Sequence, residues 1–355
     1  MSGPATEGRP DAGPTRLVVL FGGRSAEHDV SCVTAASVLG AVDRDRYEVV
    51  AVGIDRDGRW VRATESPDRL DPAGPEVDPF DVVRGPRTVV FPLLHGPLGE
   101  DGTVQGLLEL AGVPYVGCGV LSSALAMDKA MAKEVLARAG VPQAGWLALR
   151  DDPHEDGATA DRIERELGWP VFVKPANMGS SVGVSKVDDR LALGDALRLA
   201  FGFDEWIVVE EAIVGREVEC AVLGDLDPDT SVMGEIVPSH EFYDYDDKYS
   251  GEGAELHVPA DLPADVALAA RDLARQAFVA LRCAGLARVD LFYEEAGRGL
   301  LVNEVNTIPG FTPYSMYPRL WGATGLPYAA LIDRLVDLAL SRHRRNEGRT
   351  GRARA

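Results

Sequence analysis

The chain has 355 residues and a formal net charge of -20, and 46% of its residues are hydrophobic. This length predicts two or three domains instead of one simple core, and the charge argues against general binding to nucleic acids or acidic membranes. No apolar run approaches the length of a membrane span, and the four cysteines lack the C-x-x-C spacing of a zinc site. We therefore expect a cytoplasmic enzyme with reduced thiols.

Strand patterns alternate with helical patterns between residues 15 and 122. The predicted strands are Leu17–Phe21, Tyr47–Ile54, Arg87–Leu94 and Val113–Val116, and the predicted helices are Ser31–Val42 and Thr103–Ala111. This alternation is typical of a parallel α/β domain. The Pro/Asp/Gly-rich stretch Ala63–Gly85 is predicted to be a long surface loop.

Two polar stretches follow predicted strands of this domain, at the places where ligands of α/β sheets collect. The first, Gly22–Ser31, contains Glu27, and the second, His95–Gly102, is rich in glycine and polar groups. Capping of the following helix is an alternative explanation for the first stretch.

The middle of the chain predicts a smaller α+β unit. A helix is expected over Ser123–Ala139, ended by Gly140. Strand Val171–Pro175 carries Lys174 and leads into the Gly/Ser-rich loop Ala176–Gly183. Glycines let the backbone approach a ligand, and N–H groups with serine hydroxyls hold phosphate oxygens. The loop is not a Walker A loop, because no G-K-[ST] follows, and a simple hairpin turn is the alternative.

Lysine is scarce in this chain. Only five of the 36 basic residues are lysines, namely Lys129, Lys133, Lys174, Lys186 and Lys248. A chain that uses arginine elsewhere is expected to keep lysine where a compact ammonium group matters, for instance beside a phosphate.

Two further segments suggest a nucleotide site. Glu210 and Glu211 follow an apolar strand, and Glu217 comes seven residues after Glu210. A strand that leads into an interdomain linker can present Glu210 to a purine edge, and a solvated turn is the alternative. The stretch His240–Gly253 contains three tyrosines without a secondary-structure period, which predicts an active-site lid, with disorder as the alternative.

The most informative stretch is a predicted β-hairpin near the C-terminal end. Its strands are Leu286–Tyr293 and Gly299–Val305. Residues two apart on a strand face the same way, so Arg288 lies beside Asp290, and Glu304 beside Asn306. Two carboxylates and an amide oxygen suit Mg²⁺. An ion pair between Arg288 and either acid is the alternative.

Taken in this order, these segments resemble the D-alanine–D-alanine ligase family, part of the ATP-grasp superfamily. The resemblance extends over about Leu17–Leu340. Each matching stretch alone is weak evidence for the family, but all eight in the same order are specific for it. They are Gly22–Ser31, His95–Gly106, Met127–Lys129, Lys174–Lys186, Glu210–Glu217, Tyr243–Tyr249, Arg288–Asp290 and Asn303–Met316.

The resemblance implies an α/β ATP-grasp fold of three domains, with α+β central and C-terminal parts and ATP between them. We expect a parallel α/β substrate domain at 15–122, a central domain at 123–210 and a C-terminal, metal-binding domain at 211–341. Residues 1–14 are expected to form a disordered tail and residues 342–355 a flexible Arg-rich tail.

The resemblance also implies a reaction. One D-alanine carboxylate attacks the γ-phosphate of ATP, and the amine of a second D-alanine attacks the acyl phosphate, giving the dipeptide, ADP and phosphate. Relatives that make D-alanyl-D-lactate carry histidine near Tyr249, so Tyr249 favours the dipeptide. The alternatives are a D-alanine–D-lactate or D-alanine–D-serine ligase, another ATP-grasp ligase, and a nucleotide-binding regulatory protein without catalysis.

The nucleotide and metal residues carry over position by position. The contacts to the ATP phosphates are matched by Lys129, Lys174, Ser181 and Lys248. The contacts to the adenine and ribose are matched by Glu210, Glu211, Ile213 and Glu217. The ligands of two Mg²⁺ ions, with Mn²⁺ as an alternative ion, are matched by Asp290, Glu304 and Asn306.

The amino-acid residues carry over in the same way. The acid that receives the first D-alanine's ammonium is matched by Glu27, with His95 nearby. The oxyanion contacts are matched by Arg288 and the N–H of Gly310. The site for the second D-alanine's carboxylate is matched by Ser315 and the backbone of Met316. The residues that hold the lid closed, together with Glu27, are matched by Ser180 and Tyr249. A homodimer is usual among relatives and is expected here.

Overall fold

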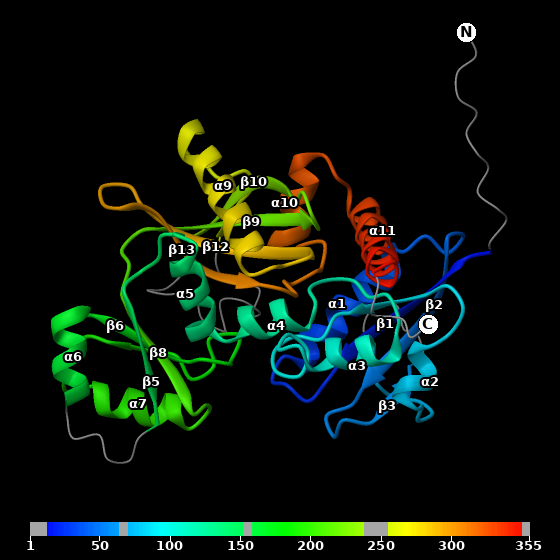
Figure 1. Ribbon diagram of the computed structural model, residues 1–355, viewed down its shortest axis with the longest axis horizontal. Coiled ribbons are helices and arrows are strands. Elements are labelled where there is room, and N and C mark those ends of the chain that lie inside the picture. Colours follow the sequence, from blue (N-terminus) through cyan, green and yellow to red (C-terminus); the bar gives the residue numbers. More distant parts are fainter. Residues whose placement is uncertain (1–12, 64–69, 152–157, 238–254, 350–355) are drawn as a thin grey trace, which may run out of the picture.

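Figure 1 shows the computed structural model, which describes residues 13–63, 70–151, 158–237 and 255–349. Three β-sheets organise the molecule, and in this view they lie at the right, the lower left and the top. Within these described ranges, no helix is both long enough and apolar enough to cross a membrane. The expected mixture of α and β structure is confirmed.

The N-terminal sheet has the strand order β3-β2-β1-β4. Its central strand, β1 (Thr15–Gly22), runs parallel to β2 (Tyr47–Ile54) and β4 (Thr88–Pro92). Apolar residues pack on both faces of β1, which explains the continuous apolar run at Leu17–Phe21. The expected parallel α/β arrangement is present, and one short edge strand, β3 (Trp60–Arg62), pairs antiparallel with β2.

The helices of this part are α1 (His28–Ala41), α2 (Pro79–Val83) and α3 (Thr103–Ala111). The loop prediction for Ala63–Gly85 is wrong where α2 forms, because Asp78 accepts hydrogen bonds from two N–H groups of the first turn and caps the helix. The predicted strand Val113–Val116 is reduced to one bridge, from Tyr115 to Val90.

The single helix predicted over Ser123–Ala139 consists of two helices, α4 (Val120–Met127) and α5 (Lys129–Arg138). Asp128 between them has an extended backbone with ψ 101°, and its carboxylate accepts a hydrogen bond from the N–H of Met131. Asp128 therefore caps α5. In Figure 1, α5 lies between the sheets of the middle and C-terminal parts.

The middle sheet has the order β5-β8-β6-β7 and is antiparallel throughout. Its strands are β5 (Trp146–Arg150), β6 (Val171–Pro175), β7 (Ser185–Val187) and β8 (Trp206–Glu211). Helices α6 (Ala158–Glu166) and α7 (Leu193–Phe201) cover one face. Lys174 and Glu210 alternate with Val173 and Val209, which pack toward these helices, so both charged side chains project from the opposite face.

The C-terminal sheet has the order β11-β10-β9-β12-β13, with antiparallel neighbours. Its strands are β9 (Arg216–Gly224), β10 (Asp229–Val237), β11 (Glu255–His257), β12 (Gly285–Glu294) and β13 (Gly299–Asn306). Helix α9 (Ala264–Ala280) packs on one face. The predicted hairpin is confirmed as β12 and β13, with Arg288 opposite Asn306 and Asp290 opposite Glu304.

Two final helices connect the C-terminal and N-terminal sheets, namely α10 (Met316–Thr324) and α11 (Tyr328–Glu347). One core cluster contains Phe21 of β1, Leu223 of β9 and Leu335 of α11, so these two parts share a core. Arg342 of α11 donates a hydrogen bond of 2.8 Å to the carbonyl of Tyr115. Helix α11 continues to Glu347, past the start of the tail expected at 342–355.

Candidate functional site

Charged residues from four elements meet between the middle and C-terminal sheets. They line a small, partly open space of about 10 Å³, which has room for roughly one water molecule. Its charged lining residues are Lys129 and Lys133 of α5, Lys174 of β6, Glu210 of β8 and Glu304 of β13. The structure therefore brings together two predicted phosphate lysines, the predicted adenine acid and a predicted metal ligand.

Glu210 is the central acid of this cluster and is only 3% exposed. Its two carboxylate oxygens lie 3.0 Å from Nζ of Lys174 and 3.4 Å from Nζ of Lys133. Burial alone raises the pKa of Glu210, but the two ammonium charges outweigh it and lower the pKa to about 2. Glu210 is therefore ionised at neutral pH.

The two lysines respond differently to burial. Burial lowers the pKa of Lys133 more than the charge of Glu210 raises it. Burial also lowers the pKa of Lys174, but the charges of Glu210 and Glu304 together raise it above its ordinary value. Lys133 had no predicted role, although its position four residues after Lys129 puts both on one face of a helix.

The Gly/Ser loop between β6 and β7 is held against α5. Lys129 donates a 2.5 Å hydrogen bond from Nζ to the carbonyl of Met178. Ser180 and Ser181 both have left-handed backbones, with φ 48° and 59°. Two successive non-glycine residues in this region are strained, a property that concentrates at ligand clamps. This geometry agrees with the predicted phosphate loop.

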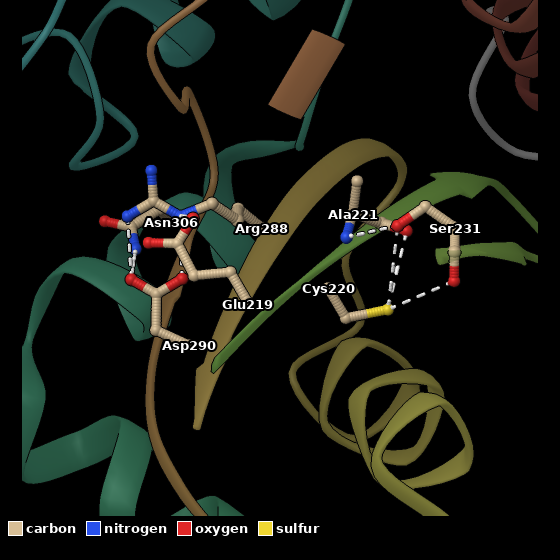
Figure 2. Close-up of polar contacts among 7 residues, drawn as sticks. All are labelled: Glu219, Cys220, Ala221, Ser231, Arg288, Asp290 and Asn306. Carbon is tan, nitrogen blue, oxygen red and sulfur yellow. Dashed lines mark hydrogen bonds and ion pairs between the residues drawn. The ribbon is translucent and has the colours of Figure 1, made fainter. Parts of the chain in front are cut away.

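The hairpin of β12 and β13 carries the predicted metal ligands (Figure 2). Arg288 donates two hydrogen bonds of 2.7 Å, from Nε and a terminal nitrogen, to the two oxygens of Asp290. Asn306 donates a third, of 2.9 Å, from Nδ2 to Asp290. The ion pair that was the alternative interpretation is thus present, between Arg288 and Asp290. The described residues contain no cluster of three or more His, Cys, Asp or Glu side chains suited to a metal.

The donor set nevertheless fits a magnesium ion. Asp290 and Glu304 are directly opposite each other in the strand register, so their carboxylates share one face of the hairpin. Asn306 contributes an amide oxygen from the same face. An all-oxygen set with few protein ligands is what Mg²⁺ uses when phosphate oxygens and water complete its shell.

Glu219 is a residue of this site that the sequence argument missed. It lies on β9 opposite Asp290, and its carboxylate is 3.1 Å from Nε of Arg288. Burial lowers the pKa of Arg288, but Asp290, Glu219 and Glu304 together raise it well above its ordinary value. Its position in the sequence is a signal that could have identified it, because Glu219 is two residues after Glu217 and therefore lies on the same face of the strand.

Glu27 connects the N-terminal sheet to the phosphate loop. The residue is 8% exposed, and its carboxylate accepts a hydrogen bond from the hydroxyl of Ser180. A Cβ atom at Gly96 would lie 2.5 Å from this carboxylate, and one at Gly179 would lie 3.0 Å from it. Glycine at both positions is therefore what lets two loops close on Glu27.

His95 is buried beside Glu27. Its Nδ1 donates a 3.0 Å hydrogen bond to the carbonyl of Ile308, and burial lowers its pKa despite the nearby charge of Glu27. Glu100, which had no predicted role, accepts hydrogen bonds from the N–H groups of Gly96 (2.7 Å) and Ile308 (3.2 Å). Burial and the charge of Glu27 raise the pKa of Glu100 to about 8.

The loop after β13 carries the remaining predicted amino-acid residues. A Cβ atom at Gly310 would lie 3.1 Å from Oγ of Ser315. Ser315 precedes α10, and Met316 is the first residue of that helix. The free N–H groups at a helix N-terminus suit a carboxylate, as the prediction for Met316 requires.

The other predicted residues are placed as follows. Glu211 accepts a hydrogen bond of 2.6 Å from Arg298 of the hairpin, which links the middle and C-terminal parts. Ile213 follows β8, and Glu217 lies on β9. Lys248 and Tyr249 lie outside the described residues, as does the whole predicted lid.

Comparisons with known proteins cover almost the whole chain. The family model "D-ala D-ala ligase N-terminus" matches residues 16–118, and "D-ala D-ala ligase C-terminus" matches residues 135–337. A protein of Geobacillus kaustophilus named D-alanine–D-alanine ligase is 47% identical, over 94% of this chain and 96% of its own length. A protein of the same name from Kineococcus radiotolerans is 49% identical, over 92% and 97%.

Solved structures agree with the sequence relatives. The D-alanine–D-alanine ligase of Coxiella burnetii superposes with a TM-score of 0.79 at 34% identity, over 95% of this chain and 97% of that one. The VanG D-Ala:D-Ser ligase of Enterococcus faecalis superposes with a TM-score of 0.81 at 36% identity, over 92% and 99%.

Proposed function

Because the chain belongs to the D-alanine–D-alanine ligase family, we propose that it joins two D-alanine molecules with ATP to make the dipeptide used in peptidoglycan. It is an ATP-dependent ligase with the ATP-grasp fold. The observation that carries the proposal is the hydrogen bond between Ser180 and Glu27, which joins the proposed phosphate loop to the proposed amino-acid site.

The proposed nucleotide contacts include the charged residues that meet between the middle and C-terminal sheets. The phosphates are held by Lys129, Lys174, Ser181 and Lys248. The base and ribose are held by Glu210, Glu211, Ile213 and Glu217. Asp290, Glu304 and Asn306 would hold two Mg²⁺ ions, or Mn²⁺ in their place, which neutralise the charge of the transferring phosphate.

The chemistry begins at the first D-alanine, whose ammonium group is paired with Glu27, with His95 beside it. Its carboxylate oxygen forms a bond to the γ-phosphorus of ATP while the bond from that phosphorus to the bridging oxygen of ADP breaks. The acyl phosphate that results is shielded from water by the lid, which Ser180, Tyr249 and Glu27 hold closed.

The second step is acyl transfer. The second D-alanine is held by its carboxylate at Ser315 and the N–H of Met316, and its uncharged amine attacks the acyl carbonyl. Arg288 and the N–H of Gly310 stabilise the oxyanion. The bond from carbon to the phosphate oxygen then breaks, phosphate leaves, and the nitrogen loses one proton to give the amide.

Phosphate release measured with ATP and different second substrates tests this proposal. D-alanine alone should support turnover, and L-alanine should not. D-serine and D-lactate distinguish the dipeptide ligase from the two alternative ligases, one of which is represented by the VanG relative. Equal rates with D- and L-alanine would overturn the substrate assignment, and no turnover with any amino acid would favour a regulatory protein.

Oligomeric state and location are separate proposals. We infer a homodimer from the family resemblance, and light scattering of the purified chain tests it. A cytoplasmic location is supported by the use of ATP and by four buried cysteine thiols, none of them in a disulfide, and cell fractionation tests it.

A further inference from the structure

Arg288 lies between two carboxylates that come from different strands (Figure 2). Asp290 follows it by two positions on β12, and Glu219 lies opposite Asp290 on β9. Nε of Arg288 is 2.7 Å from Asp290 and 3.1 Å from Glu219. Cys220, the next residue of β9, points to the other face of the sheet, toward Ser231, so Glu219 is the residue of this pair that reaches Arg288.

Asp290 accepts more hydrogen bonds than a carboxylate in a simple ion pair with one arginine. One oxygen accepts from Nε of Arg288, and the other accepts from both Arg288 and Asn306. These are the oxygens that the proposed function gives to a metal ion. A cation bound there would compete with the guanidinium group for the same lone pairs and would repel its charge.

Glu219 is placed to keep Arg288 when this competition occurs. Its side chain is only 4% exposed, and a buried carboxylate requires a charged or hydrogen-bonded partner. It is one strand further from Glu304 than Asp290 is, because β12 separates β9 from β13. Its carboxylate is paired with Arg288 at 3.1 Å, on the side of β12 away from Glu304.

We propose that Glu219 is a positioning residue that holds the guanidinium of Arg288 in the site while Asp290 binds a metal ion. This inference rests on the proposed function. Without the Glu219 charge, Arg288 keeps Asp290 as its nearest carboxylate partner. A metal ion that binds Asp290 must then displace Arg288, which has no second partner on β9. Both metal affinity and oxyanion stabilisation then decrease.

Mn²⁺ binding to the full-length protein tests the proposal without requiring turnover. Mn²⁺ is titrated in the presence of a saturating non-hydrolysable ATP analogue, and free Mn²⁺ is followed by its EPR signal. Glu219→Gln should weaken Mn²⁺ binding about 10-fold, and it should lower kcat with little change in KM for ATP. Unchanged Mn²⁺ affinity in Glu219→Gln would overturn the proposal.

A matched control exists in the same sheet. Glu235 of β10 forms a similar pair, 2.7 Å from Arg216, and lies opposite Val218, so its side chain is on the other face from Glu219. Glu235→Gln should leave Mn²⁺ affinity and kcat unchanged. If Glu219→Gln does not fold, Glu219→Asp replaces it; that variant keeps the charge and should bind Mn²⁺ within about 3-fold of wild type.

A double-mutant cycle separates positioning from the simple loss of a nearby negative charge. In the Arg288→Met background, Glu219→Gln should no longer change Mn²⁺ affinity, because the group through which Glu219 acts is gone. An equal weakening in both backgrounds would overturn the proposal. Phosphate release by the wild type with D-alanine is measured alongside, since its absence would contradict the proposed function itself.

Discussion

The hydroxyl of Ser180 donates a hydrogen bond to the carboxylate of Glu27, although the two residues are 153 positions apart in the chain. Glu27 precedes α1 in the N-terminal part, and Ser180 lies in the loop between β6 and β7. Gly96 and Gly179 approach the same carboxylate closely. The amino-acid site and the phosphate loop are therefore mechanically connected.

Replacing Ser180 with alanine should weaken this connection. A hydrogen bond to a charged group contributes about 2 kcal/mol, equivalent to on the order of 30-fold. We expect kcat/KM for the first D-alanine to fall by that factor, measured by phosphate release at saturating ATP. Ser37→Ala, which removes an exposed hydroxyl from α1, is the control. Equal kinetics in the two variants would contradict the role given to Ser180.

Gly96→Ala should lower both stability and activity, although it adds only one methyl group. Gly96 has φ 75°, and the added methyl carbon would lie 2.5 Å from Glu27. We expect a loss of about 1–3 kcal/mol in stability and a higher KM for D-alanine. Gly106, in α3, has open space around its Cβ position, so Gly106→Ala should be neutral or stabilising by up to about 1 kcal/mol. Denaturant unfolding compares the two variants directly.

Glu304→Gln should remove most of the activity. The proposed metal ions neutralise phosphate charge, an effect of several kcal/mol, so kcat should fall on the order of 10³-fold. Mn²⁺ titration should show correspondingly weaker binding. Glu295→Gln, on the exposed turn of the same hairpin, should retain wild-type values. Full-rate synthesis by Glu304→Gln would exclude Glu304 from the metal site.

Stability should decrease in acid partly because of Glu210. Its pKa of about 2 in the folded protein lies below the ordinary value of 4.5. The ionised form therefore stabilises the fold above pH 4.5, and this contribution, on the order of 3 kcal/mol, is lost as the pH falls toward 2. Between pH 5 and pH 3, the unfolding free energy of Glu210→Gln should decrease less than that of the wild type. Chemical denaturation at each pH measures both. The exposed Glu205→Gln should behave like wild type.

The residues that share a face within each strand of the hairpin were predictable from the sequence. Alternation along β12 and β13 determines these faces, and a short turn limits the possible registers. The pairing of Asp290 with Glu304 depends on a further feature that the alternation does not predict, a register shift of one residue at Asn303. Family resemblance added roles to these positions, and local pattern alone left the ion pair and the metal site as alternatives.

Contacts between distant strands were not predictable in the same way. Glu219 reaches Arg288 only because β9 pairs with β12, and no local signal specifies that neighbour. Lys133 pairs with Glu210 across two elements for the same reason. The break at Asp128 was not predictable from the apolar pattern, which continues across it, whereas the cap that starts α5 depends on one side chain.

The cavity between α5, β8 and β13 has a consequence for how tightly ATP is held. A space of about 10 Å³ has room for roughly one water molecule, so the side chains that line it, among them Lys129, Glu210 and Glu304, must rearrange before a nucleotide can occupy it. The measured free energy of nucleotide binding is then the free energy of the ligand contacts less the free energy that this rearrangement costs. Substitutions that loosen the packing between the middle and C-terminal parts, without changing a residue that holds the nucleotide, should accordingly make nucleotide binding tighter.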